Sequence, residues 1–145
     1  MSQVSLGFSS CPNDTFIFDA LLHGKIDTEG LTFLPVIEDV ESLNKKAQLA
    51  QLDITKLSYH AFIYLTNTYN LLNSGSALGF NCGPLLIQNS KNKITDINTA
   101  SIAIPGKYTT ANFLLSLAFP NAKNKKEMLF SDIENALLLN KIDAG

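Results

Sequence analysis

The feature that most constrains the fold is an alternation of strand and helix patterns that starts near the N-terminus. Apolar runs typical of strands occupy residues 3–9, 31–37 and 52–58. Helical patterns occupy 12–24 and 39–50, between those runs. A chain that passes from strand to helix to strand twice in so few residues pairs its strands in parallel, through right-handed crossovers. We therefore predict an α/β fold built on a parallel sheet.

The second part of the chain shows the same alternation. Three further strands are predicted at 84–88, 101–105 and 127–131, and a helix is predicted at 109–119. Ser131 and Glu134 match a capping box ahead of a last helix. The two parts also echo each other, because each places a helix before a strand that is predicted to start at an aspartate, Asp53 or Asp143.

A stretch rich in glycine around Cys82 separates the two parts. We predict that residues 1–84 form the N-terminal part of one lobe and residues 85–145 part of a second lobe. A buried strand usually has about five to six residues, and the strand predicted at Asp143 has far fewer. We therefore expect the sequence to be cut short and the fold to be incomplete at its C-terminus.

Composition narrows the function classes. The 145 residues are 46% hydrophobic and 17% charged, with a net charge of −2, and the basic cluster at 123–126 is short, so we expect no nucleic-acid partner. Neither Cys11 nor Cys82 has a metal-ligand spacing, so no metal is expected. No apolar run reaches about 18 residues and the N-terminus does not resemble a signal peptide, which predicts no membrane segment and a cytoplasmic location.

Three junctions between a strand and a helix gather groups that bind anions. They lie at 9–14, 56–58 and 105–111. In open parallel sheets such junctions supply free N–H groups at the carboxyl ends of the strands, which favours a carboxylate ligand. The candidate side chains are those of Asn13, Asp14, Lys56, Ser58, Thr109 and Thr110.

Each candidate also has an ordinary structural explanation. Hydroxyl residues before a helix are caps far more often than ligand contacts, lysines are mostly exposed, and Asp14 suits a first helical turn. No nucleophile, base and orienting acid can be identified by spacing, and the glycines match neither a Walker loop nor a dinucleotide motif. The residues by themselves support an anion-binding α/β protein.

Six segments together resemble the 1,4-dihydroxy-6-naphthoate synthase family of the futalosine route to menaquinone. They are LGFSSCPNDTFIFDALLHG, EDVESLN, DITKLSYHA, GSALG, GPLLI and IPGKYTTANFLLSL. The resemblance implies the two-lobed fold of type II periplasmic binding proteins, with the active site in the cleft between the lobes. It also implies a carbon–carbon lyase that converts cyclic de-hypoxanthine futalosine to 1,4-dihydroxy-6-naphthoate without a metal or nucleotide cofactor.

Carried over by motif, the resemblance implies a substrate-binding set from both lobes. Its members are Lys56, Leu57 and Ser58 in the first lobe and Thr110 and Ala111 in the second. We add Thr109, Asn13 and Asp14 as further candidates for the same site. The general-base histidine of the family is expected just after Gly145, so no catalytic residue is predicted within the chain.

These implications lead to expectations about the isolated chain. We expect it to lack synthase activity and to expose core surface, which favours self-association or completion by a second polypeptide. Three alternatives stay open. They are a non-catalytic module that binds a small carboxylate, a chorismate dehydratase-like enzyme, against which SCPNDTF and PGKYTTA argue, and a degenerate fragment without a function.

Overall fold

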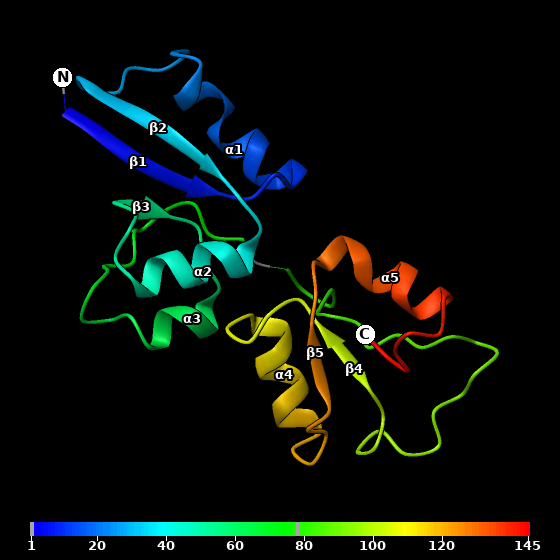
Figure 1. Cartoon of the computed structure of the whole chain (residues 1–145). Helices are drawn as coiled ribbons and strands as arrows, with labels where there is room; N and C mark the ends of the chain where they lie inside the picture. The colour runs from blue at the N-terminus through cyan, green and yellow to red at the C-terminus, as the bar shows by residue number, and fades with distance from the viewer. Residues whose placement is uncertain (1, 78) are drawn as a thin grey trace. The chain divides into compact units, whose positions relative to one another are not determined.

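The computed structural model describes residues 2–77 and 79–145, and the chain divides into two compact units (Figure 1). Unit 1 spans Met1–Ser76 and unit 2 spans Ala77–Gly145. Leu78, in the glycine-rich stretch predicted to separate the parts, lies outside the described residues, as does Met1. Both units contain helices and parallel strands, so the α/β class is confirmed. That the chain holds parts of two lobes, divided between residues 84 and 85, stays a prediction.

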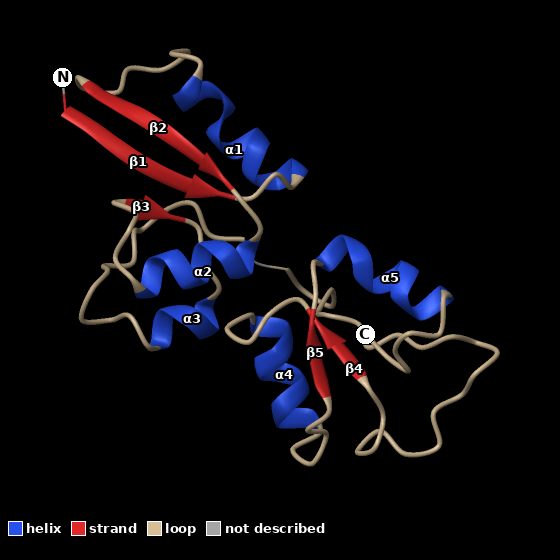
Figure 2. Cartoon of the chain, viewed as in Figure 1, coloured by secondary structure: helices blue, strands red, loops and turns tan. Residues whose placement is uncertain are grey.

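Unit 1 follows the predicted alternation (Figure 2). Its elements are β1 (Ser2–Phe8), α1 (Pro12–Leu22), β2 (Leu31–Ile37), α2 (Val40–Gln48), β3 (Ile54–Thr55) and α3 (Tyr59–Ile63). The strand β1 is central, with β2 and β3 as its parallel neighbours on either side. Parallel pairing is thus confirmed, although β3 has two residues instead of the seven predicted at 52–58.

Local sequence explains where the helices of unit 1 begin. The sulfur of Cys11 accepts a hydrogen bond from the backbone N–H of Asp14 at the start of α1. Asp39 caps α2 by accepting from the N–H groups of Glu41 and Ser42. Burial acts to raise the pKa of Asp39, but the hydrogen bonds from Ser42 and Glu41 outweigh it and lower that pKa.

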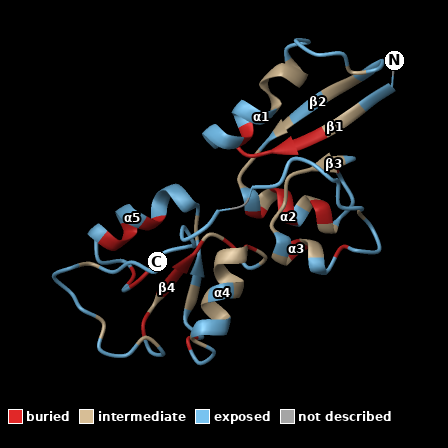
Figure 3. Cartoon of the chain, turned by 180° about the vertical axis from the view of Figure 1, so that it is seen from behind, coloured by how far each residue is buried: buried red, intermediate tan, exposed pale blue. Residues whose placement is uncertain are grey.

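The core of unit 1 forms where β1 meets α2. Leu6, Phe8, Leu43 and Ala47 are almost completely buried, and Figure 3 shows the buried residues at the C-terminal end of β1 and along α2. Burial of large apolar side chains is the main favourable contribution to folding. The core therefore holds the carboxyl end of β1 firmly, and that end leads into the first predicted junction.

Unit 2 repeats this arrangement with shorter strands. Its elements are β4 (Ile102–Ile104), α4 (Thr110–Ala118), β5 (Lys125–Glu127) and α5 (Phe130–Leu138). The strand β4 pairs in parallel with β5, and on its other side Ile102 makes a parallel bridge to Ala144. Residues of β4, α5 and the segment after α5 share a buried cluster that includes Ala103, Ile133 and Ile142.

Two strand predictions and one capping prediction in unit 2 are wrong. The strand expected at 127–131 lies at Lys125–Glu127, because parallel pairing sets Ile102 opposite Lys125, and α5 already begins at Phe130. Ser131 therefore lies inside α5 and cannot cap it. The run at 84–88 forms no strand and makes an isolated bridge at Gln88 with hydrogen bonds between the backbones of Ile87 and Gly145.

None of the helices in the described ranges is long and apolar enough to cross a membrane.

Candidate functional site

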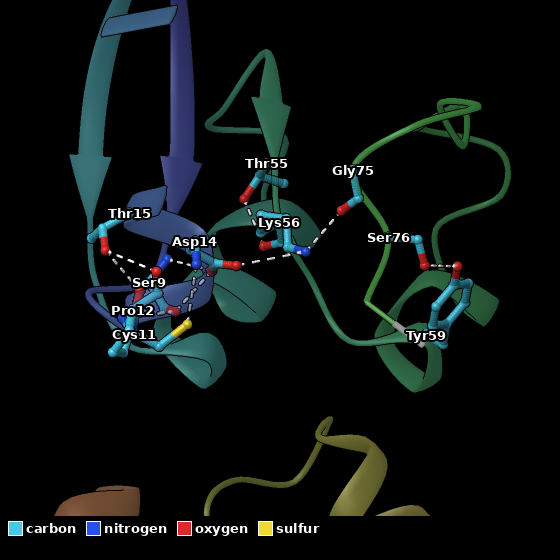
Figure 4. A network of polar contacts seen from close by, with 10 residues as sticks. All are labelled: Ser9, Cys11, Pro12, Asp14, Thr15, Thr55, Lys56, Tyr59, Gly75 and Ser76. Carbon is cyan, nitrogen blue, oxygen red and sulfur yellow. Dashed lines mark hydrogen bonds and ion pairs between the residues drawn. The ribbon is translucent and has the colours of Figure 1, made fainter. Parts of the chain in front are cut away.

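A buried carboxylate organises the end of β1 in unit 1 (Figure 4). Asp14 is 7% exposed, and its Oδ2 accepts hydrogen bonds from the backbone N–H of Ser9 at 3.0 Å and from the hydroxyl of Ser9 at 2.8 Å. The Nζ of Lys56 lies 3.6 Å from Oδ1 of the same carboxylate. A buried charge needs such partners, so Asp14 serves to hold Ser9 and Lys56.

Lys56 joins three segments of unit 1. Its backbone N–H donates to the carbonyl of Gly7 in β1 at 2.7 Å, and its Nζ donates to the carbonyl of Gly75 at 2.8 Å. Nearby, the hydroxyls of Tyr59 and Ser76 lie 2.6 Å apart. The side chain of Lys56 is 24% exposed, and an ammonium group has three N–H donors. The ammonium can therefore bind an anion while it stays anchored.

Ser58 stands at the start of α3, but its hydroxyl does not cap the helix. Instead, its Oγ accepts a hydrogen bond from Nδ2 of Asn44 at 3.2 Å, and its backbone N–H donates to Oδ1 of Asn44 at 3.0 Å. The ordinary explanation of this serine as a side-chain cap therefore fails. Its neighbour Leu57 is half-buried, whereas Asn13 at the other junction of unit 1 is exposed.

In unit 2 the predicted residues lie in one turn at the start of α4. The hydroxyl of Thr109 is buried, donates to the carbonyl of Gly106 at 2.7 Å and accepts from the N–H of Asn112 at 3.3 Å. Thr109 is thus a cap, as its ordinary explanation predicts. Thr110 and Ala111 are half-buried first residues of the helix, where backbone N–H groups have no acceptor within the helix.

Ala111 also lines a cavity of about 840 Å³ in unit 2. Its walls are mainly apolar, from Ile104, Leu114, Leu115, Phe119, Phe130 and Ile133. Among the described residues that line it, Ser131 and Glu134 contribute the polar side chains. Such a cavity suits a mainly apolar molecule that carries few polar groups. Sequence reasoning missed it, because its walls come from segments far apart along the chain.

Sequence reasoning also missed Asn44. It is fully buried on α2 beside Leu43, close to the core residue Ala47. A polar side chain on the apolar face of a helix needs an internal hydrogen-bond partner. That position was the available signal, and the partner is Ser58.

Comparisons with known proteins give the family. The sequence profile of a family described as Menaquinone biosynthesis matches residues 4–145. The chain belongs to this menaquinone biosynthesis family. Two relatives are named 1,4-dihydroxy-6-naphthoate synthase. The Thermus thermophilus protein is 46% identical over 117 residues, which is 81% of this chain and 42% of the relative. The Streptomyces coelicolor protein is 34% identical over 148 residues, which is 98% of this chain and 51% of the relative.

A solved structure is similar to this chain in fold and in sequence. The crystal structure of protein AF1704 from Archaeoglobus fulgidus is 38% identical, with a TM-score of 0.90 over 99% of this chain and 52% of that chain. The chain spans about half the length of the relatives it matches. The predicted resemblance to a portion of the naphthoate synthase family is thus confirmed.

Proposed function

We propose that this chain takes part in a carbon–carbon lyase that converts cyclic de-hypoxanthine futalosine to 1,4-dihydroxy-6-naphthoate. The menaquinone biosynthesis family and the names of the two relatives support this reaction. The proposal includes the two-lobed architecture of type II periplasmic binding proteins, of which this chain would hold part of each lobe. It also includes a cytoplasmic location.

The observation that carries the proposal is the state of Lys56 and Ser58. The ammonium of Lys56 is anchored by Asp14 and Gly75 and keeps donors for a ligand. The hydroxyl of Ser58 is held in place without being used as a cap. Two donors of this kind, two residues apart, suit the carboxylate of a small molecule. We propose that they bind the substrate together with the backbone of Leu57.

Unit 2 supplies a second set of contacts. The free N–H groups at the start of α4 favour an anion or a polarised oxygen, and the apolar cavity beside Ala111 suits an aromatic ring. We propose that Thr110 and Ala111 contact the substrate and that Thr109 shapes the turn. In unit 1, Asp14 acts through Lys56, and the exposed Asn13 is a peripheral contact.

An assay of the full-length gene product with cyclic de-hypoxanthine futalosine tests the reaction, with the naphthoate followed by mass spectrometry. We expect product from the wild type and a loss of about 10- to 100-fold in kcat/KM for Lys56→Met and for Ser58→Ala, the range for a lost hydrogen bond to a charged group. Exposed Lys91→Met is the matched control for loss of a lysine. Binding of the naphthoate without conversion of the substrate would favour a carboxylate-binding module. The absence of both binding and conversion would refute the proposal.

We also propose that further polypeptide covers the apolar surface of unit 2. Leu117, Leu138 and Leu139 are exposed on unit 2 and do not line the cavity proposed to hold the substrate. A second copy of the chain or a completing polypeptide would bury them. Sedimentation of the 145-residue chain tests this, and a monomer that melts cooperatively would contradict it.

A further inference from the structure

Asn44 makes three hydrogen bonds although it is completely buried. Its Nδ2 donates to Oε2 of Glu41 at 3.1 Å and to Oγ of Ser58 at 3.2 Å, and its Oδ1 accepts from the backbone N–H of Ser58 at 3.0 Å. Two of these bonds join Asn44, on α2, to Ser58. Asn44 therefore holds both the backbone and the hydroxyl of Ser58.

The chemistry of these bonds determines which partner donates. A backbone N–H can only donate, so the amide atom that faces the N–H of Ser58 must be the oxygen. The other amide atom is then the nitrogen, which can only donate, and it lies against the hydroxyl oxygen of Ser58. The hydroxyl is thereby an acceptor toward Asn44, and its own hydrogen has no acceptor within the described part of the chain.

We propose that Asn44 is a positioning residue that makes Ser58 a hydrogen-bond donor to the carboxylate of the substrate. A carboxylate only accepts hydrogen bonds, so a hydroxyl that binds it must direct its hydrogen outward. Asn44 enforces this direction because the amide atom that faces the hydroxyl is Nδ2, which only donates, while Oδ1 is turned to the backbone N–H of Ser58. This inference rests on the proposed function, in which Ser58 contacts the substrate.

Asn44→Asp tests this direction, because it keeps the shape of the side chain and replaces the Nδ2 donor, which faces both Ser58 and Oε2 of Glu41, by an acceptor. The introduced carboxylate can accept the hydroxyl hydrogen of Ser58, so the substrate loses its donor. We expect the Kd for 1,4-dihydroxy-6-naphthoate, measured by titration calorimetry, to rise about 10- to 100-fold, the range for a lost hydrogen bond to a charged group.

A double-mutant cycle separates positioning from general structure. If Asn44 acts through Ser58, the double variant with Asn44→Asp and Ser58→Ala has the same Kd as Ser58→Ala. Ser42→Ala is the matched control, since it removes a hydrogen bond to Asp39 on the same helix and touches neither Asn44 nor Ser58. Its Kd should equal that of the wild type. If Asn44→Asp does not fold, the neutral Asn44→Ala replaces it in the cycle with the same expectation.

The outcomes distinguish this inference from the proposed function. Binding of the naphthoate without conversion of the substrate overturns the proposed reaction and leaves the inference to be judged by the cycle. An unchanged Kd in Asn44→Asp, or effects that multiply in the double variant, overturns the inference alone. A wild-type protein that does not bind the naphthoate overturns both.

Discussion

In unit 1 the carboxylate of Asp53 accepts hydrogen bonds from the N–H of Ser5 at 2.8 Å and from its hydroxyl at 2.6 Å. In unit 2, Asp143 accepts the same two bonds from Ser101, both at 2.7 Å. In each unit the N–H of the aspartate also donates back to the serine hydroxyl. This serine–aspartate clamp ties the segment after the second helix to β1 in unit 1 and to the residue just before β4 in unit 2. The echo predicted at these two aspartates is therefore a repeated tertiary contact.

The spacing around the clamp is also repeated. The helices α2 and α5 are both nine residues long, and each is followed by a residue with left-handed backbone, Ala50 with φ 50° and Asn140 with φ 53°. From helix to left-handed residue to aspartate, the steps along the sequence are identical in the two units. The two units are thus two versions of one β-α-β-α framework, in which the segment after the second helix bonds back to the first strand or its start.

The side chains on this framework differ where the candidate site lies. Counted from the aspartate that follows each helix, Glu134 stands in unit 2 where Asn44 stands in unit 1. Asn44 is buried against Ser58, whereas Glu134 is exposed and lines the cavity. The comparison teaches that clamps and spacing maintain the sheet, while one helix position is free to take a unit-specific role.

The largest effect on the comparison is expected when one large core side chain is truncated in each unit. Leu6 in β1 and Ile102 in β4 are 1% and 0% exposed and stand directly after the clamp serines. Leu6→Ala and Ile102→Ala should each cost about 2–5 kcal/mol of unfolding free energy, because each leaves a cavity. Amide hydrogen exchange measured at increasing urea concentration should show that the loss of protection is confined to the mutated unit. Equal loss of protection in both units would show that they do not unfold as separate repeats.

A smaller effect is expected where the frameworks differ in packing. Gly7 stands two residues after Ser5, as Ala103 does after Ser101. A Cβ at Gly7 would lie 2.7 Å from both Cδ1 of Leu52 and Oγ1 of Thr55. Gly7→Ala should therefore cost about 1–3 kcal/mol through overpacking. Denaturant titration measures this, with exposed Gly83→Ala as the control in open space. A neutral Gly7→Ala would mean that the sheet of unit 1 has the room that unit 2 has.

The clamps predict a pH dependence that should be alike in the two units. The hydroxyl and then the N–H of Ser5 lower the pKa of Asp53, and the N–H and then the hydroxyl of Ser101 lower the pKa of Asp143. A lowered pKa in the folded state stabilises the protein above the unfolded value of about 3.9, and this stability is lost as the pH falls through the folded value.

Asp53→Asn and Asp143→Asn should each remove part of this dependence. Denaturant titrations between pH 6 and pH 3 should then show that each variant loses less stability on acidification than the wild type does. This change in stability should be smaller than that expected for the packing substitutions. A pH dependence that persists unchanged in one variant would restrict the clamp to the other unit.

The smallest expected effect concerns the left-handed residue after each helix. Alanine is strained at a positive φ, whereas asparagine and glycine tolerate it. Ala50→Asn should stabilise unit 1 by about 0.5–1 kcal/mol, and Asn140→Ala should destabilise unit 2 by a similar amount. Thermal unfolding measures both changes. An Ala50→Asn variant that melts below the wild type would show that the two turns are not equivalent.

Much of unit 1 could be predicted from sequence, because its signals act between near neighbours. The start of α1 follows from Pro12 in its first turn, the start of α2 from the cap residue Asp39, and the left-handed backbone after α1 from Gly24. In unit 2, by contrast, apolar residues such as Met128 and Leu129 suggested a strand, and Ser131 suggested a helix start. The segment that pairs with β4 is instead Lys125–Glu127.

The sequence by itself determined the α/β class, the parallel pairing of the strands, the helix starts in unit 1 and the echo at Asp53 and Asp143. These features depend on periodicity and on contacts between residues close in the chain, and both can be recognised in a single sequence. Tertiary structure decided the place of β5, the cavity beside Ala111 and the direction of the hydrogen bond between Asn44 and Ser58. Each of these depends on which distant residues meet, and local preference does not contain that information.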